Sequence, residues 1–160
     1  MTEVVVAQTN NTVQIAAPGP VGPSPTKVTY TPGGGTLDGI QPTFDGAPLI
    51  TGHYSRIGEV VMFQINVEFD NILTFGTGQY FLTLPFKAQY ATMIRGGCLH
   101  NPQNDRQYPI AGHLDAGSNV LSLWTTSSQG QDEGFDNNNP INLHQDDFFH
   151  VAGVYFAQTT

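Results

Sequence analysis

The segment between Glu59 and Phe69 constrains the fold most, because its apolar side chains recur at every second position. The repeating apolar residues are Val61, Phe63, Ile65, Val67 and Phe69, and those between them are Met62, Gln64, Asn66 and Glu68. Successive side chains of a β-strand point to opposite faces of a sheet, so this period predicts a strand. We expect the first set to face a core and the second set to face a wetter surface.

Similar patterns recur throughout the chain after Lys27, where short apolar or alternating runs are interrupted by Gly, Pro, Asn and Asp. Further strands are predicted at 79–84, which Pro85 ends, at 119–125 and at 148–156. No stretch has the period of a helix. About eight strands are expected, enough for a jelly roll, so residues 27–160 are predicted to form an all-β, antiparallel jelly-roll sandwich.

Residues 1–26 are predicted to form an appendage to that domain. Within residues 1–17, two short β-branched runs flank Asn10-Asn11, a pair that tolerates the positive φ of a tight turn, so a β-hairpin is expected. A hairpin of this size is marginal alone in water, which predicts that it is an anchoring arm that docks on a partner. Its apolar face would comprise Val4, Val6, Val13 and Ile15. Residues 18–26 contain repeated Pro and Gly and are expected to be an extended linker.

The charge pattern narrows the classes of partner. Only 11% of the residues are charged, and 13 acidic against 5 basic residues give a formal net charge of −8. The basic residues are scattered, which disfavours a surface that follows nucleic-acid phosphates. The single cysteine, Cys98, excludes an internal disulfide. No apolar run approaches the roughly 20 residues of a membrane span, and residues 1–8 do not resemble a signal peptide, so we expect assembly in the cytoplasm without membrane insertion.

A longer pattern between Thr43 and Phe86 combines several turn and strand signals. An aromatic residue at Phe44 is followed by Gly52-His-Tyr-Ser-Arg-Ile-Gly58, the long strand, Phe75-Gly-Thr-Gly78 and Leu84-Pro85-Phe86. This order resembles a domain found in tail-fibre, minor tail and other surface proteins of tailed bacteriophages. The stretch from Pro140 to Tyr155, in which an acidic turn leads into a last hydrophobic strand, is similar to the closing pattern of that family. The arm and the Pro-Gly linker also resemble the start of minor tail proteins from phages of actinobacteria.

The resemblance implies a jelly roll similar to that of complement and tumour-necrosis-factor domains, which usually form homotrimers. It also implies a structural component of a bacteriophage virion, located in the assembled particle. The first expectation is a minor tail or tail-tip protein that is anchored to other virion proteins through residues 1–25 and projects a trimeric domain toward the host surface. The alternative is a capsid decoration protein attached through the same arm. A free carbohydrate-binding module and a phage depolymerase are disfavoured.

The histidines and the acidic residues are the candidate metal ligands of this sequence. The five histidines, at His53, His100, His113, His144 and His150, are dispersed and lack the spacing of a preformed metal site. In a homotrimer, one histidine that points toward the three-fold axis would be present three times around it, so an ion bound on that axis remains an alternative. The acidic residues around the Asn-rich segment, at Asp132, Glu133, Asp136, Asp146 and Asp147, do not match the twelve-residue calcium loop, which favours a solvated acidic loop. No metal and no cofactor are expected.

No catalytic motif is apparent, so the chain is not expected to be an enzyme. There is no Gly-x-Ser-x-Gly sequence, and Cys98 with His100 forms only a same-face pair two residues apart on a predicted strand. Binding is a better hypothesis than catalysis. Four aromatic residues close to polar segments are candidates for surface recognition of a host glycan or protein, namely Tyr90, Tyr108, Trp124 and Phe135. The alternative for each is burial in the core or in the trimer interface.

Overall fold

The computed structural model describes residues 25–126 and 131–159, and these residues form strands and loops with no helix. The all-β class predicted from the sequence is thereby confirmed. The predicted arm, with Val4, Val6, Val13 and Ile15, and the linker up to position 24 lie outside the described residues. The twelve strands are β1 (Val28–Tyr30), β2 (Gly34–Thr36), β3 (Thr43–Phe44), β4 (Leu49–Ile57), β5 (Val60–Glu68), β6 (Ile72–Thr74), β7 (Tyr80–Thr83), β8 (Thr92–Asn101), β9 (Arg106–Leu114), β10 (Val120–Thr126), β11 (Asp132–Gly134) and β12 (Phe148–Phe156).

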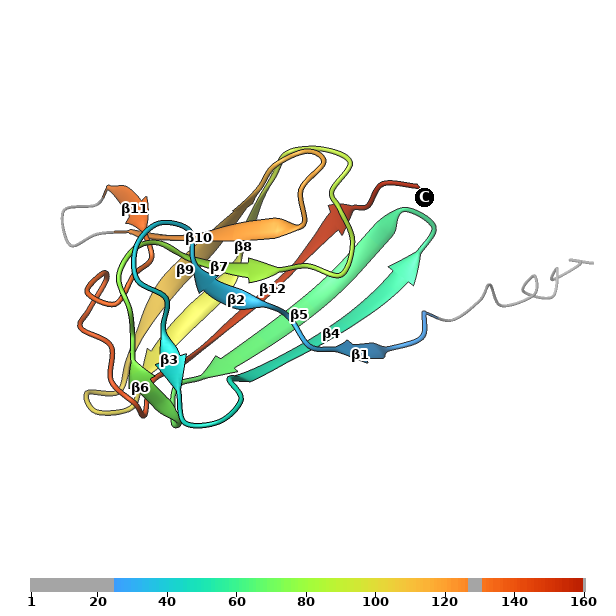
Figure 1. Cartoon of the computed structure of the whole chain (residues 1–160). Coiled ribbons are helices and arrows are strands. Elements are labelled where there is room, and N and C mark those ends of the chain that lie inside the picture. The colour runs from blue at the N-terminus through green and yellow to red at the C-terminus, as the bar shows by residue number, and fades with distance from the viewer. Residues whose placement is uncertain (1–24, 127–130, 160) are drawn as a thin grey trace, which may run out of the picture.

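Ten of the strands form one antiparallel sheet that curls around the core (Figure 1). The strand order is β1-β4-β5-β12-β8-β9-β10-β7-β2, and β11 pairs with β10. The two edge strands, β1 and β2, follow one another in the chain, so the curl brings the ends of the sheet together. There Gly34 approaches β4 so closely that a Cβ atom would lie 3.0 Å from Cδ1 of Ile50. Strands β3 and β6 form a separate two-stranded sheet.

Strand β5 has the facing that its sequence period predicts. Val61, Phe63, Ile65 and Val67 are all buried, whereas Met62, Gln64 and Glu68 are exposed. On the inner side of the curled sheet, the buried residues of β5 pack with apolar residues from the other strands, including Leu82, Ile94, Leu99, Ile110, Leu121, Leu123, Phe149, Val151 and Tyr155. Burial of this set supplies the main stabilising free energy of the domain.

Strand β8 contains a β-bulge that decides which of its side chains reach the outer surface. The register with β9 changes between Ile94, which pairs with Gly112, and Gly97, which pairs with Ile110. One extra residue is therefore inserted into β8, and both Arg95 and Gly96 are exposed. A Cβ atom at Gly96 would collide with the carbonyl oxygen of Ala152 on β12, so the bulge requires glycine at this position.

Candidate functional site

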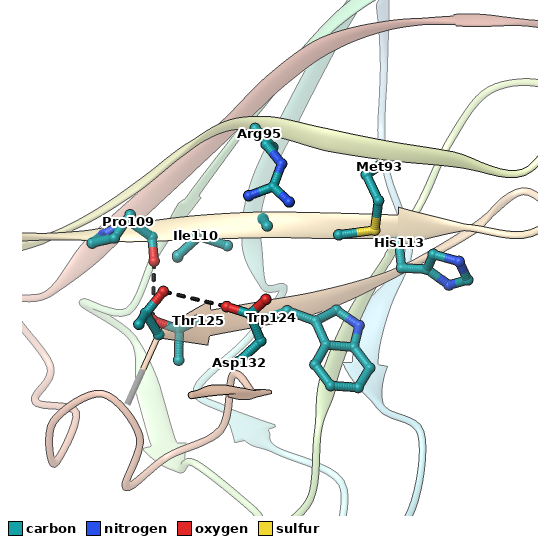
Figure 2. Close-up of a pocket in the computed structure, with 10 residues that line it drawn as sticks. Met93, Arg95, Pro109, Ile110, His113, Trp124, Thr125 and Asp132 are labelled. Carbon is teal, nitrogen blue, oxygen red and sulfur yellow. Dashed lines mark hydrogen bonds between the residues drawn. The ribbon is translucent and has the colours of Figure 1, made fainter. Parts of the chain in front are cut away.

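A groove of about 570 Å³ lies on the outer face of the sheet, over β8, β9, β10 and β11 (Figure 2). The side chains around it come from four strands and are Met93, Arg95, Pro109, His113, Trp124, Thr126 and Asp132. Figure 2 shows Arg95 on one side of β9 and Asp132 on the other, with Met93 and His113 toward one end of the groove and Pro109 toward the other. The charged or ionisable residues of the groove are Arg95, His113 and Asp132, and its large aromatic residue is Trp124.

The groove is hollow because its central strand carries a small side chain at the middle position. Ala111 on β9 lies opposite Trp124 on β10, while the neighbouring outward positions of β9 hold the larger Pro109 and His113. Side chains two residues apart share one face of a strand, so these three residues make a low centre with higher ends. The β8 bulge adds Arg95 as the side wall. No sequence motif marked this groove, although the Gly96-Gly97 pair inside a strand was a possible signal for the bulge.

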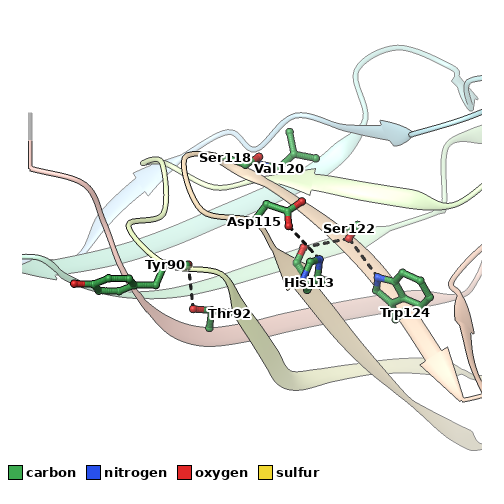
Figure 3. Close-up of polar contacts among 8 residues, drawn as sticks. All are labelled: Tyr90, Thr92, His113, Asp115, Ser118, Val120, Ser122 and Trp124. Atoms are coloured by element: carbon green, nitrogen blue, oxygen red, sulfur yellow. Dashed lines mark hydrogen bonds and ion pairs between the residues drawn. The ribbon is translucent and has the colours of Figure 1, made fainter.

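Hydrogen bonds hold the indole of Trp124 in place (Figure 3). Its Nε1 donates to the hydroxyl oxygen of Ser122 at 3.3 Å, and that hydroxyl donates to the carbonyl oxygen of His113 at 3.1 Å. The imidazole Nδ1 of His113 lies 3.8 Å from a carboxylate oxygen of Asp115. Because the Ser122 hydroxyl is bonded to the backbone of His113 and not to its ring, the three residues lack the base–nucleophile contact of a catalytic triad.

The two charged side chains of the groove, Arg95 and Asp132, have hydrogen-bond donors and acceptors that remain available to a ligand. Within residues 25–126 and 131–159, Arg95 has no hydrogen bond or ion pair, and the ion pairs of that part involve only His100 with Asp105 and His113 with Asp115. Asp132 accepts one long hydrogen bond, at 3.5 Å, from the Thr126 hydroxyl. Both side chains are exposed at the groove, so a ligand could reach them.

The four aromatic candidates have different environments. Trp124 is half-buried and lines the groove. Tyr90 is 58% exposed, and its ring centroid lies 6.2 Å from that of Phe156 in an edge-to-face contact. Tyr108 is half-buried and packs against the core. The sequence therefore identified one groove residue, Trp124, and the structure does not bring the other three to the same place.

Phe135 requires a correction, because it cannot take part in surface recognition. Its side chain is fully buried. The ring lies between Tyr80 and Phe149, at centroid distances of 5.4 and 5.3 Å, in edge-to-face geometry. The segment around it is polar in sequence, but the loop turns inward at this residue and uses it to close the core. The alternative of core burial is correct for Phe135.

A second surface feature is an apolar patch formed by the outer face of β4, β5 and β12 together with Tyr90, which lies before β8 and contacts Phe156; we call it the outer-face patch. Its members are Ile57, Met62, Tyr90, Val154 and Phe156, each at least 38% exposed. They are neighbours across the sheet, since Val154 pairs with Met62, and both Phe156 and Ile57 pair with Val60. Exposed apolar side chains gathered on adjacent strands mark an interaction surface more often than scattered ones do.

The predicted acidic loop is held by its own side chains. Asp136 accepts hydrogen bonds from the backbone N–H groups of Asn138 and Asn139, at 2.7 and 3.0 Å. Asp147 is fully buried, and its Oδ2 accepts the N–H of His144 at 2.8 Å. Burial raises the pKa of Asp147. This effect is larger than the opposing effects of the hydrogen bond from His144 and of the nearby His144 and His100 side chains, which lower the pKa. Across the described ranges, no group of three or more His, Cys, Asp or Glu side chains could hold a metal ion.

Comparisons with protein-family models, curated proteins and solved structures find no match to this chain. A search of the described residues also finds no helix of the length and apolarity needed to cross a membrane. The groove and the outer-face patch are the two surface features of the described residues on which a function can be based.

Proposed function

We propose that the chain is a non-enzymatic structural subunit of a bacteriophage virion, a minor tail or tail-tip protein that is anchored by its N-terminal arm and projects a trimeric β domain. The observation that carries the proposal is the outer-face patch, in which four large apolar side chains on one sheet face and the adjacent Tyr90 are exposed together. A subunit that is covered by copies of itself needs such a surface, whereas an isolated domain gains nothing from it. The assignment to a virion rests on the phage-like pattern in residues 43–86 and 140–155.

The outer-face patch supports self-association in particular. Four of its side chains lie on β5, on β12 and on the neighbouring β4, so the surface is broad and not a single edge. The members of the patch carry no charge, so contact between copies through them buries no unpaired charged group. Association of three copies through this face is therefore our proposal for the assembled state.

The path of the chain into the domain supports an anchoring role for residues 1–25. Residues 25–29 are all exposed, and β1 is an edge strand of the large sheet. The first buried residue of the described chain is Pro32, and the buried apolar residues of the core begin at Val61. The buried core of the domain is thus made of side chains that come after the linker, which supports our proposal that residues 1–25 serve to bind other virion proteins. An apolar arm of this kind can add a strand to the sheet of its partner.

The groove supports binding in preference to catalysis. Its ionisable side chains, Arg95, His113 and Asp132, do not include a nucleophile in contact with a base, and the nearby Ser122 hydroxyl is bonded to a backbone carbonyl. General acid–base catalysis needs a group within hydrogen-bond reach of the proton that it transfers, together with a fixed partner for the reacting atom. A recognition surface needs only complementary shape and hydrogen bonds, which the groove provides.

Electron microscopy of intact phage particles labelled with antibodies to residues 27–160 tests the proposal. Labels on the tail tip or tail would support the minor tail assignment, and labels spread over the head would support the alternative of a capsid decoration protein. Particles that carry no label, while the protein is abundant in the lysate, would overturn the virion assignment. The detection of the chain by mass spectrometry in gradient-purified particles provides the matched measurement.

A further inference from the structure

We infer that the groove over β8, β9, β10 and β11 binds a neutral oligosaccharide. The inference deepens the proposed function, since a domain projected from a virion meets the glycans of the host surface. The binding site consists of Arg95, Ala111, Trp124 and Asp132, and the chemistry of these four residues selects the ligand.

The size of the groove fits a short oligosaccharide. Pockets for small organic ligands measure about 300–1,000 Å³, and the groove, at about 570 Å³, lies within that range. It is too large to be an ion site. Ala111 sets the depth at the centre, because any longer side chain there would occupy the space opposite Trp124.

Trp124 provides a surface on which a sugar ring can stack. A pyranose has an apolar face of C–H groups, which packs against the face of an indole. Because Nε1 of Trp124 already donates to Ser122, the indole needs no hydrogen bond from the ligand. The same bond holds the ring in one orientation before a ligand arrives, which reduces the entropy lost on binding.

The two charged side chains select a ligand that is polar but uncharged. The guanidinium of Arg95 can only donate hydrogen bonds, and the ionised carboxylate of Asp132 can only accept them. A sugar hydroxyl does both, so neighbouring hydroxyls can accept from Arg95 and donate to Asp132. A ligand carboxylate would be attracted by Arg95 but repelled by Asp132, and a ligand amine would face the opposite conflict. Neither charge is already used in an ion pair within the described part of the chain.

Fluorescence of the full-length chain gives a direct measurement, because Trp124 is its single tryptophan. The purified protein is titrated with the neutral trisaccharides maltotriose, mannotriose, galactotriose and triacetylchitotriose. Two charged counterparts are included, trigalacturonic acid for galactotriose and the deacetylated amine form for triacetylchitotriose. We expect a saturable change in Trp124 emission with at least one neutral sugar and weaker binding of its charged counterpart.

Three variants locate the binding. Ala111→Leu fills the centre of the groove and is expected to abolish the response. Arg95→Met and Asp132→Leu each remove one side of the hydrogen-bonding pair, and each should weaken binding by about tenfold or more, the usual effect of losing a hydrogen bond to a charged group. Arg106→Met, which removes an exposed arginine outside the groove, should leave the affinity unchanged. Thermal melts of all variants establish that they are folded.

The results distinguish this inference from the proposed function. No saturable change with any neutral trisaccharide at about 10 mM, well above millimolar dissociation constants, overturns the inference. Tighter binding of a charged counterpart, or binding that survives Ala111→Leu in a folded protein, also overturns it. None of these results affects the location of the protein in particles, which the antibody labels measure separately. Conversely, glycan binding by a protein that is absent from virions would retain the groove site and remove the virion role.

Discussion

The indole Nε1 of Trp124 donates to the hydroxyl of Ser122, two residues earlier on the same outer face of β10, at 3.3 Å. Ser122→Ala removes this acceptor and the bond from Ser122 to the carbonyl oxygen of His113. We expect a loss of stability of about 1 kcal/mol, since the groups are half-exposed and water replaces part of the lost bonds. We also expect altered emission from Trp124. Ser55→Ala, at an outward position of β4 where the hydroxyl has no hydrogen bond within the described residues, is the control. Equal emission spectra in the two variants would contradict the role of Ser122.

Phe63→Ala tests the facing of β5. The ring is 4% exposed and contacts Tyr155 at a centroid distance of 5.9 Å. Truncation to alanine removes buried apolar area and leaves a cavity, so we expect a loss of roughly 3–5 kcal/mol in the free energy of unfolding. Gln64→Ala, on the exposed side of the same strand, should change stability little. Denaturant titrations measure both, and similar midpoints for the two variants would show that Phe63 contributes no more than a surface residue.

Asp147→Asn tests the effect of a buried carboxyl group on stability as a function of pH. Burial raises the pKa of Asp147 in the folded protein above its usual value, and its Oδ1 is buried with no hydrogen-bond partner among residues 25–126 and 131–159. A raised folded-state pKa means that the contribution of this group to stability is fully present below its unfolded pKa, near 4, and is lost as the pH rises through the folded value. Asparagine keeps an acceptor for the N–H of His144 but cannot ionise.

We therefore expect the melting temperature of Asp147→Asn relative to wild type to rise between about pH 4 and pH 7. His144, Asp146 and His100 act on the same carboxyl group, so the exposed Asp146→Asn variant serves as a control for the loss of a nearby charge. Differential scanning calorimetry at several pH values measures the effect. A difference that falls with increasing pH would mean that the ionised carboxylate stabilises the fold.

Val154→Asp tests the outer-face patch as the contact between copies. Val154 is a 51% exposed member of the patch and pairs with Met62, so a carboxylate there would have to be buried without a partner in the trimer. We expect the wild-type chain to scatter light as a species of about three times its 17.3 kDa mass, and the variant to be monomeric at micromolar concentration. Leu73→Asp is the control, because Leu73 is 64% exposed on β6, at the opposite end of the fold from the last residues of β12 (Figure 1). A trimer that tolerates Val154→Asp would place the contact elsewhere.

A chain that begins at Thr26 tests the arm. All the described strands lie after this residue, so the shortened protein should fold and associate like the full chain. We expect it to be missing from particles assembled without the wild-type protein, and the double change Val4→Asp with Val6→Asp to have the same effect on incorporation with unchanged melting behaviour. Quantitative mass spectrometry of purified particles measures occupancy. Normal occupancy of the shortened protein would place attachment in the β domain and favour the capsid decoration alternative.

Local patterns were sufficient to place four strands, which correspond to β5, β7, β10 and β12, and to predict the facing of β5, but they did not place the long strands β4, β8 and β9. A strand has a side-chain period of two, so Val61, Phe63, Ile65 and Val67 had to share a face, and the core needed that face to be the apolar one. Proline cannot supply an N–H to a sheet, which set the end of β7 near Pro85. These properties depend on residues close together in the chain, and they are visible in the sequence for that reason.

The groove and the fate of the aromatic residues depended on contacts between distant segments. Trp124 and Phe135 are both aromatic residues near polar stretches, yet one lines the groove and the other is fully buried between Tyr80 and Phe149. Arg95 and Asp132 lie far apart in the sequence. They line the same groove only because β8, β9, β10 and β11 are neighbours in the sheet. The sequence by itself determined the all-β class and the facing of β5. The tertiary structure decided which side chains gather into a site, because strand pairing and the bulge at Arg95 and Gly96 are set by long-range packing, which no local period records.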